Sequence, residues 1–109
     1  MAANHLLERG FRSFAFVGIS GRVWSRRRER SFCRAIANAG YQVNVYKSPP
    51  TCRDQQWDRE QPALARWLGD LPKPTGLMAC NDDRGREVLE ACRAANVHVP
   101  EELAVIGVD

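Results

Sequence analysis

The sequence predicts an α/β fold, a Rossmann-like parallel sheet of about four strands with flanking helices. Four short apolar runs, rich in Val, Ile, Phe and Tyr, lack strict alternation, as expected of strands buried on both faces of a parallel sheet. Each run is separated from the next by a segment with helical periodicity. We therefore expect the order α-β-α-β-α-β-α-β, with strands at residues 13–18, 41–46, 76–80 and 103–108.

The first two predicted helices, residues 2–9 and about 25–39, each end at a glycine, Gly10 and Gly40. Glycine is common just after a helix because this position often takes a left-handed conformation that other residues disfavour. The apolar residues at helical spacing should face the core. These inward residues are Leu6, Leu7, Phe32, Ile36 and Ala39.

The last two helices have boundaries set by prolines and acidic residues. The third is expected over about residues 60–71, where Pro72 ends it. The fourth is expected to begin with Asp82 or Asp83 as the N-cap and to end before Pro100. The inward stripes of these two helices are Leu64, Trp67, Leu68 and Leu71, and Val88, Leu89, Cys92 and Ala95.

The composition is that of a soluble globular domain. The chain has 109 residues, of which 44% are hydrophobic and 27% charged, and a formal net charge of +3. This length gives one domain at most and is short for a deep ligand cleft, so we expect residues 1–109 to form a single, partial lobe. There is no apolar run of about 18 residues and no signal peptide, which predicts a cytoplasmic protein without membrane contact.

The cysteines do not have the spacing of a metal site. None is part of a C-x-x-C pair, and two fall within predicted helices beside apolar neighbours. We expect all of them to be reduced and to act as small hydrophobic residues, with no metal and no cofactor. The four cysteines are Cys33, Cys52, Cys80 and Cys92.

The carboxyl ends of the predicted strands gather residues that suit a carbohydrate. Ligands of an open parallel sheet bind at this edge, where the connecting loops converge. Pairs of sugar hydroxyls accept two hydrogen bonds from a guanidinium, donate two to a carboxylate, or do one of each with an amide, while the C–H face of the ring packs on an aromatic plane. The candidate ligand-binding residues are Trp24 and Arg28 after the first strand, Trp57 after the second, Asn81 after the third and Asp109 after the fourth.

These residues also have simpler explanations, which the sequence leaves open. Asn81 and Asp82 are typical helix N-caps, and Trp57 is also explained by packing against the neighbouring helix. A run of arginines typically forms a solvated helix face, which accounts for Arg26, Arg27 and Arg30. Arg28, however, precedes Phe32 by four residues, so it shares a face with a core residue and needs a polar partner.

Several segments resemble the effector-binding core of lactose-repressor-type transcription regulators. They include the strand at 14–18, the segment 74–82 that ends in Asn-Asp, and the segment 99–109 with the pattern Pro-Glu-x-x-x-Val-Ile-Gly-x-Asp. The resemblance covers nearly the whole chain and implies one lobe of a type I periplasmic-binding-protein-like fold. It also implies that Arg28, Asn81 and Asp109 hydrogen-bond to sugar hydroxyls and that Trp57 lies against the sugar ring.

The same resemblance implies the partners and the activity. Trp24, Trp57 and residues 65–68 are most similar to xylose-responsive members, in which the sensor is joined to a C-terminal AraC-type DNA-binding domain. The implied effector is a sugar, with xylose expected, and the implied partners are a second lobe and a second copy in a homodimer. DNA would be contacted only through a domain absent from this chain. One departure is Ser31, where relatives commonly have glycine before the aromatic residue.

Three other classes of function match parts of the sequence less well. A nucleophile elbow is opposed by Arg22, which stands where its second glycine belongs, so we do not expect an enzyme. A phospho-acceptor signalling domain is suggested by Asp82 and Asp83, but the first strand ends without the carboxylates that hold Mg²⁺. A small nucleic-acid-binding module is favoured by the arginine cluster, although no matching fold motif is present.

Overall fold

The predicted alternation of helices and strands is confirmed by a computed structural model, which describes residues 2–19, 22–46, 57–99 and 101–107. Each predicted strand lies within one residue or two of its expected bounds, and each predicted helix is present. In chain order the elements are α1 (Ala2–Glu8), β1 (Phe14–Val17), α2 (Val23–Asn38), β2 (Val43–Tyr46), α3 (Trp57–Asp70), β3 (Thr75–Ala79), α4 (Asp82–Ala95) and β4 (Leu103–Ile106).

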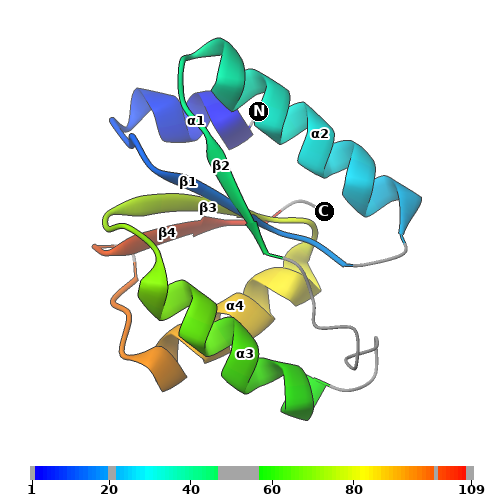
Figure 1. Cartoon of the computed structure of the whole chain (residues 1–109), viewed down its shortest axis with the longest axis vertical. Coiled ribbons are helices and arrows are strands. Elements are labelled where there is room, and N and C mark those ends of the chain that lie inside the picture. Colours follow the sequence, from blue (N-terminus) through cyan, green and yellow to red (C-terminus); the bar gives the residue numbers. More distant parts are fainter. Residues whose placement is uncertain (1, 20–21, 47–56, 100, 108–109) are drawn as a thin grey trace.

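The four strands form one parallel sheet in the order β2-β1-β3-β4. Val17 pairs with Tyr46 on one side and with Ala79 on the other, so three neighbouring strands end level with one another. Helices α1 and α2 cover one face of the sheet, and α3 and α4 cover the other (Figure 1). We call the edge where all four strands end the rim; it lies to the right in Figure 1.

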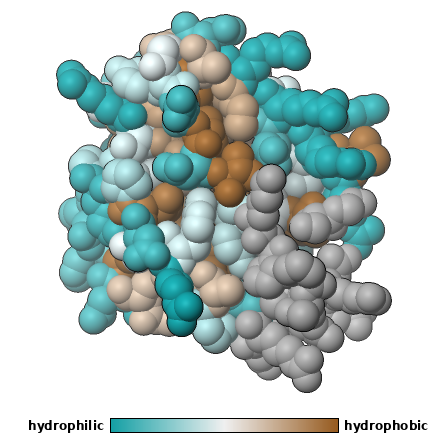
Figure 2. Space-filling view, in the orientation of Figure 1, coloured by the Kyte–Doolittle hydropathy of each residue, from teal (hydrophilic) through white to brown (hydrophobic). Residues whose placement is uncertain are grey.

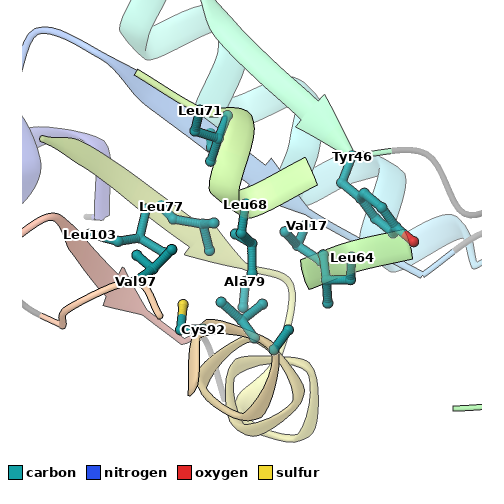
Figure 3. Packing of buried hydrophobic residues seen from close by; sticks show 13 residues of the cluster. Val17, Tyr46, Leu64, Leu68, Leu71, Leu77, Ala79, Cys92, Val97 and Leu103 are labelled. Atoms are coloured by element: carbon teal, nitrogen blue, oxygen red, sulfur yellow. The ribbon is translucent and has the colours of Figure 1, made fainter. Parts of the chain in front are cut away.

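The central strands are buried on both faces, as their apolar character predicts. In β1, Ala15 and Val17 join the core beneath α3 and α4, whereas Phe14 and Phe16 join the core beneath α1 and α2. This is the alternation of side chains that a strand imposes. Figure 3 shows the first core, in which Leu64 and Leu68 of α3 point toward β1 and β3.

Strand β2 is an edge strand, and its burial is incomplete. Val43 and Val45 are only partly buried, and both pack against the core beneath α2. Apolar surface along the course of β2 crosses the middle of the face shown in Figure 2, with polar residues above and below it. No helix in the part of the chain described by the structure is long and apolar enough to span a membrane.

The helix ends confirm the two glycine predictions and correct the predicted N-cap of the fourth helix. Gly10 and Gly40 have φ angles of 88° and 91°, in the left-handed region. Helix α4 is capped by Asn81 rather than by Asp82 or Asp83, because the Asn81 Oδ1 accepts a hydrogen bond from the backbone N–H of Arg84 at 2.8 Å. The two aspartates occupy the first turn instead, where a negative charge favours the helix dipole.

Three further expectations about the helices were wrong. Ala39, which was expected to face the core, is exposed. Helix α3 begins at Trp57, three residues before the expected start, with Pro62 inside it. Proline lacks one backbone N–H, but the apolar face of this helix, anchored by Leu64, holds the helix together. Leu89 was predicted to face the core and is instead 38% exposed, because the neighbouring Val88 takes the buried position.

The described cysteines are Cys33, Cys80 and Cys92, and all three are free thiols; Cys52 lies outside the described residues. Cys80 and Cys92 are buried, as small hydrophobic residues would be, and Cys33 is partly exposed. Burial raises the pKa of Cys92 to about 11, with the positive charge of Lys73 opposing the shift. Burial also raises the pKa of Cys33, and the charge of Glu29 raises it further.

Timed alkylation should therefore label Cys33 before Cys92 in the folded chain. With a pKa of about 11, roughly one Cys92 thiol in a thousand is ionised at about pH 8, and its sulfur is shielded as well. Peptide mass spectrometry after brief exposure to iodoacetamide measures the order. Denatured chain is the control, because both thiols should then react at similar rates; equal rates in the folded chain would contradict the prediction.

Candidate functional site

Arg28 reaches the rim, as its place on the inner side of α2 predicted. Its side chain is partly buried, and its Nη1 donates a hydrogen bond to the carbonyl oxygen of Cys80 at 2.5 Å. Its guanidinium carbon lies 5.2 Å from the centre of the Trp24 ring, which is within range of a cation–π contact. Cys80 directly follows β3 and precedes Asn81, so this contact joins α2 to the end of the third strand.

Asn81 serves as the N-cap of α4, so the simpler explanation for this residue is correct. The cap uses only the side-chain oxygen. The amide nitrogen can still donate two hydrogen bonds, and no described residue accepts one from it. Asn81 is partly exposed at the rim, so capping the helix and binding a ligand do not exclude each other.

The end of β4 packs against the turn that carries Asn81. A Cβ atom built on Gly107 would lie 2.9 Å from the Oδ1 of Asp82 and 3.6 Å from the backbone oxygen of Asn81. The chain after β4 therefore lies in van der Waals contact with this turn, and a side chain at Gly107 would have to displace the exposed Asp82 carboxylate. Asp109 follows two residues later and lies outside the described residues, so its predicted role stays a prediction.

Of the two candidate tryptophans, only Trp24 has a side chain that the structure describes. Trp24 is in the first turns of α2, is 39% exposed, and lies beside Arg28. Trp57 is the first residue of α3, and its side chain lies outside what the structure describes. The described geometry thus brings together Arg28, Asn81 and Trp24, and it leaves the side chains of Trp57 and Asp109 untested.

The turn between β1 and α2 is held by Ser25, which is only 2% exposed. Its Oγ accepts a hydrogen bond from the backbone N–H of Ile19 at 3.0 Å. Burial raises the pKa of the nearby Cys80 thiol, while a hydrogen bond with Ser25 and the charges of Arg84 and Arg28 oppose the shift. A Cβ on Gly18 would lie 2.6 Å from this Oγ and 2.8 Å from the Phe16 ring, so the turn requires glycine there.

Substitution of Gly18 by alanine should therefore destabilise the chain by about 1–3 kcal/mol, since a methyl group would overlap two buried side chains. Gly69→Ala is the matched control, because a Cβ at that helical position meets nothing within 4 Å. Alanine there should be neutral or stabilise by up to about 1 kcal/mol. Urea denaturation of both variants tests this difference, and equal stabilities would refute it.

Arg84 is the charged residue that the sequence analysis missed at this edge. It is 4% exposed and lies in the first turn of α4. Two of its nitrogens bind the two carboxylate oxygens of Glu60, Nη1 to Oε1 at 2.9 Å and Nη2 to Oε2 at 2.7 Å. Nη1 also contacts Glu87 at 3.0 Å, and Nε donates to the carbonyl oxygen of Gly18 at 3.0 Å.

The electrostatics of this pair favour the charged forms. Burial by itself lowers the pKa of the Arg84 guanidinium, but the hydrogen bonds and charges of Glu60 and Glu87 outweigh burial and hold that pKa above its ordinary value. Arg84 is therefore a fixed cation with its donors directed at named acceptors. Its guanidinium carbon also lies 5.7 Å from the centre of the Tyr46 ring, at the end of β2.

A signal for this pair was present in the sequence. Glu60 precedes Leu64 by four residues on α3, and Arg84 precedes Val88 by four residues on α4, so both charges lie on apolar stripes. Opposite charges on the inward faces of neighbouring helices indicate a buried pair, because a lone buried charge is very costly.

The rival site chemistries gain no support from the described residues. No group of three or more His, Cys, Asp or Glu side chains that could hold a metal ion occurs among them. Asp83, the alternative phospho-acceptor, is exposed and pairs with Arg86 on the helix surface. His98 follows α4 and precedes β4, which places it at the opposite edge of the sheet from the rim.

The chain is similar in sequence and in fold to known transcription regulators. The family described as "Periplasmic binding protein-like domain" matches residues 3–109. The chain is 40% identical over 108 residues to the xylose operon regulatory protein of Escherichia coli strain K12, with 96% of this chain and 27% of that protein covered. It is 38% identical over 112 residues to the protein of the same name in Haemophilus influenzae, with 100% and 29% covered.

A solved structure of a xylose-binding transcription activator superposes with a TM-score of 0.86 and 40% identity, over 99% of this chain and 29% of that chain. A transcriptional regulator of the lactose-repressor family from Corynebacterium glutamicum, at 24% identity and a TM-score of 0.75, shares the fold over 97% of this chain and 39% of that chain. These relatives are transcription regulators by name rather than enzymes. The chain spans less than a third of the length of the curated relatives described above.

Proposed function

Because this chain belongs to the periplasmic binding protein-like domain family, we propose that it is one lobe of the sugar-sensing domain of a transcription regulator that responds to xylose. The observation that carries the proposal is the 2.5 Å hydrogen bond from Arg28 to the carbonyl of Cys80, the residue directly before Asn81 at the rim. The 40% identity to a xylose operon regulatory protein supports the choice of sugar.

The chemistry of these side chains fits a pentose. The Arg28 guanidinium and the Asn81 amide nitrogen offer donors to neighbouring sugar hydroxyls, and the Trp24 ring offers an apolar plane to C–H groups. In the proposal, Asp109 accepts hydrogen bonds from two hydroxyls and Trp57 covers the ring. One donor of Arg28 binds the Cys80 carbonyl, and this bond orients the planar guanidinium at the rim.

The rest of the proposed mechanism involves parts outside this chain. A second lobe closes over the sugar, and the closed arrangement shifts the geometry of a homodimer in the cytoplasm. An AraC-type domain elsewhere in the polypeptide contacts DNA, while this lobe contacts no bases and catalyses no reaction. An isolated lobe would bind free sugar weakly, because the energy of lobe closure is missing.

Calorimetry of the longest natural polypeptide containing this sequence, against xylose and other pentoses and hexoses, tests the proposal. Asn81→Asp keeps a good N-cap but removes the amide donors, so we expect it to weaken xylose binding by roughly 1–3 kcal/mol while leaving stability almost unchanged. Asp83→Asn, on the same helix and 75% exposed, should leave binding unaltered. Unaltered binding in both Asn81→Asp and Asp109→Asn, or no preferred sugar, would refute the proposal.

A further inference from the structure

Arg84 contacts several segments of the rim at once. Its own helix follows the third strand, and Asn81 lies three residues before it. Its Nε binds the carbonyl of Gly18, the residue directly after β1, and its guanidinium lies over Tyr46, the last residue of β2. One buried side chain therefore joins the ends of three neighbouring strands, β2, β1 and β3.

The bond to Glu60 extends this set to α3. Glu60 lies in the first turn of that helix, three residues after Trp57, and its carboxylate is held by two nitrogens of Arg84. A bidentate pair between a planar guanidinium and a planar carboxylate fixes orientation as well as distance. With side-chain exposures of only 4% and 8%, neither partner is screened by water.

From these contacts we infer that Arg84 is a positioning residue for the sugar site. This inference rests on the proposed function, and it assigns Arg84 no direct contact with the sugar. The guanidinium holds the turn after β1 and the start of α3 in register with the turn that carries Asn81. All the side chains proposed to bind sugar except Asp109 come from these segments or from α2, which follows the turn after β1, so their relative placement depends on one buried cation.

Hydrogen-bonded recognition is sensitive to such placement. A ligand contact displaced by about 1 Å loses most of its directional energy, and a site is kept within about 0.5 Å by its supporting residues. A residue that only stabilises the fold would change stability and leave affinity intact. A positioning residue should change affinity even where stability has been restored, and this difference can be measured.

The test uses the longest natural polypeptide that contains this sequence, with D-xylose as the probe. We expect Arg84→Met to weaken xylose binding roughly tenfold or more by calorimetry. Val88→Ala is the matched control: Val88 is fully buried one turn further along α4, and its loss should lower stability while changing affinity less than about twofold.

A double variant separates positioning from stability. Glu60→Leu combined with Arg84→Met removes both buried charges, so stability should return toward that of the unsubstituted protein. Affinity should stay low, because the hydrogen bond to the Gly18 carbonyl is still missing. Recovery of affinity together with stability, or unchanged affinity in Arg84→Met, would overturn the inference.

Hydrogen exchange gives a readout that does not depend on sugar. In Arg84→Met the amides of Ile19 and Leu64 should exchange faster, while the amide of Val105 in β4, outside the three strands whose ends Arg84 joins, should be unchanged. If the unsubstituted polypeptide binds no xylose, the proposed function fails, and exchange alone decides the role of Arg84. Unchanged exchange at both Ile19 and Leu64 would overturn that role.

Discussion

Replacing Glu60 with leucine is expected to lower the free energy of unfolding by about 3–5 kcal/mol, one of the two largest effects predicted for a single substitution in this chain. The reason is that the buried Arg84 guanidinium loses its bidentate partner. Arg84 is 4% exposed, and its two terminal nitrogens both bind the Glu60 carboxylate. Without that carboxylate the guanidinium is a buried cation that has lost its bidentate partner, although it keeps its bonds to Glu87 and to the Gly18 carbonyl.

Urea denaturation followed by tryptophan fluorescence measures this loss. Glu87→Gln is the matched control, since Glu87 binds the same guanidinium but its side chain is 30% exposed, and it should cost no more than about 1 kcal/mol. If Glu60→Leu and Glu87→Gln lower the free energy of unfolding by the same amount, the pair of Arg84 and Glu60 is not a buried interaction.

The order of helices and strands could be predicted from the sequence because the separate local signals all indicated the same order. The apolar runs marked the strands, helical spacing marked the segments between them, and Gly10 and Gly40 marked two helix ends. Local signals of this kind depend on residues close in the chain. They were less reliable where several neighbours suited the same role, as with Asn81, Asp82 and Asp83, which are all good N-caps.

The candidate site could be predicted only in part. Arg28 was identified because its spacing from Phe32 placed it on a partly buried face, but its partner, the Cys80 carbonyl, is 52 residues away. The pair of Arg84 and Glu60 spans 24 residues and two helices. A chain pattern shows that a charge faces inward; which group meets it depends on how the helices pack on the sheet.

The face of α4 shows the same limit for apolar residues. Val88 and Leu89 are adjacent, and either can begin an apolar stripe at helical spacing. In the structure Val88, Ala91 and Cys92 are buried beneath the sheet, together with Arg84 one turn earlier, and Leu89 is left at the surface. The position of α3 beside α4 decides which stripe is covered, and no local pattern contains that information.

Two leucine-to-alanine substitutions test this assignment of the core. Leu68 in α3 is fully buried, so Leu68→Ala should lower the free energy of unfolding by about 2–5 kcal/mol through lost burial and the cavity it leaves. Leu89→Ala removes the same atoms from a side chain that is 38% exposed, and it should cost less than about 1 kcal/mol. The two variants match in chemistry and differ only in burial.

Denaturation of both variants in urea gives the comparison directly. The slope of the free energy of unfolding with urea concentration should be similar for the two, so the difference should lie in the midpoint. A cost for Leu89→Ala equal to that of Leu68→Ala would place Leu89 back in the core, as the sequence pattern alone predicted. The packing of α4 against α3, and with it the inward position of Arg84, would then be wrong.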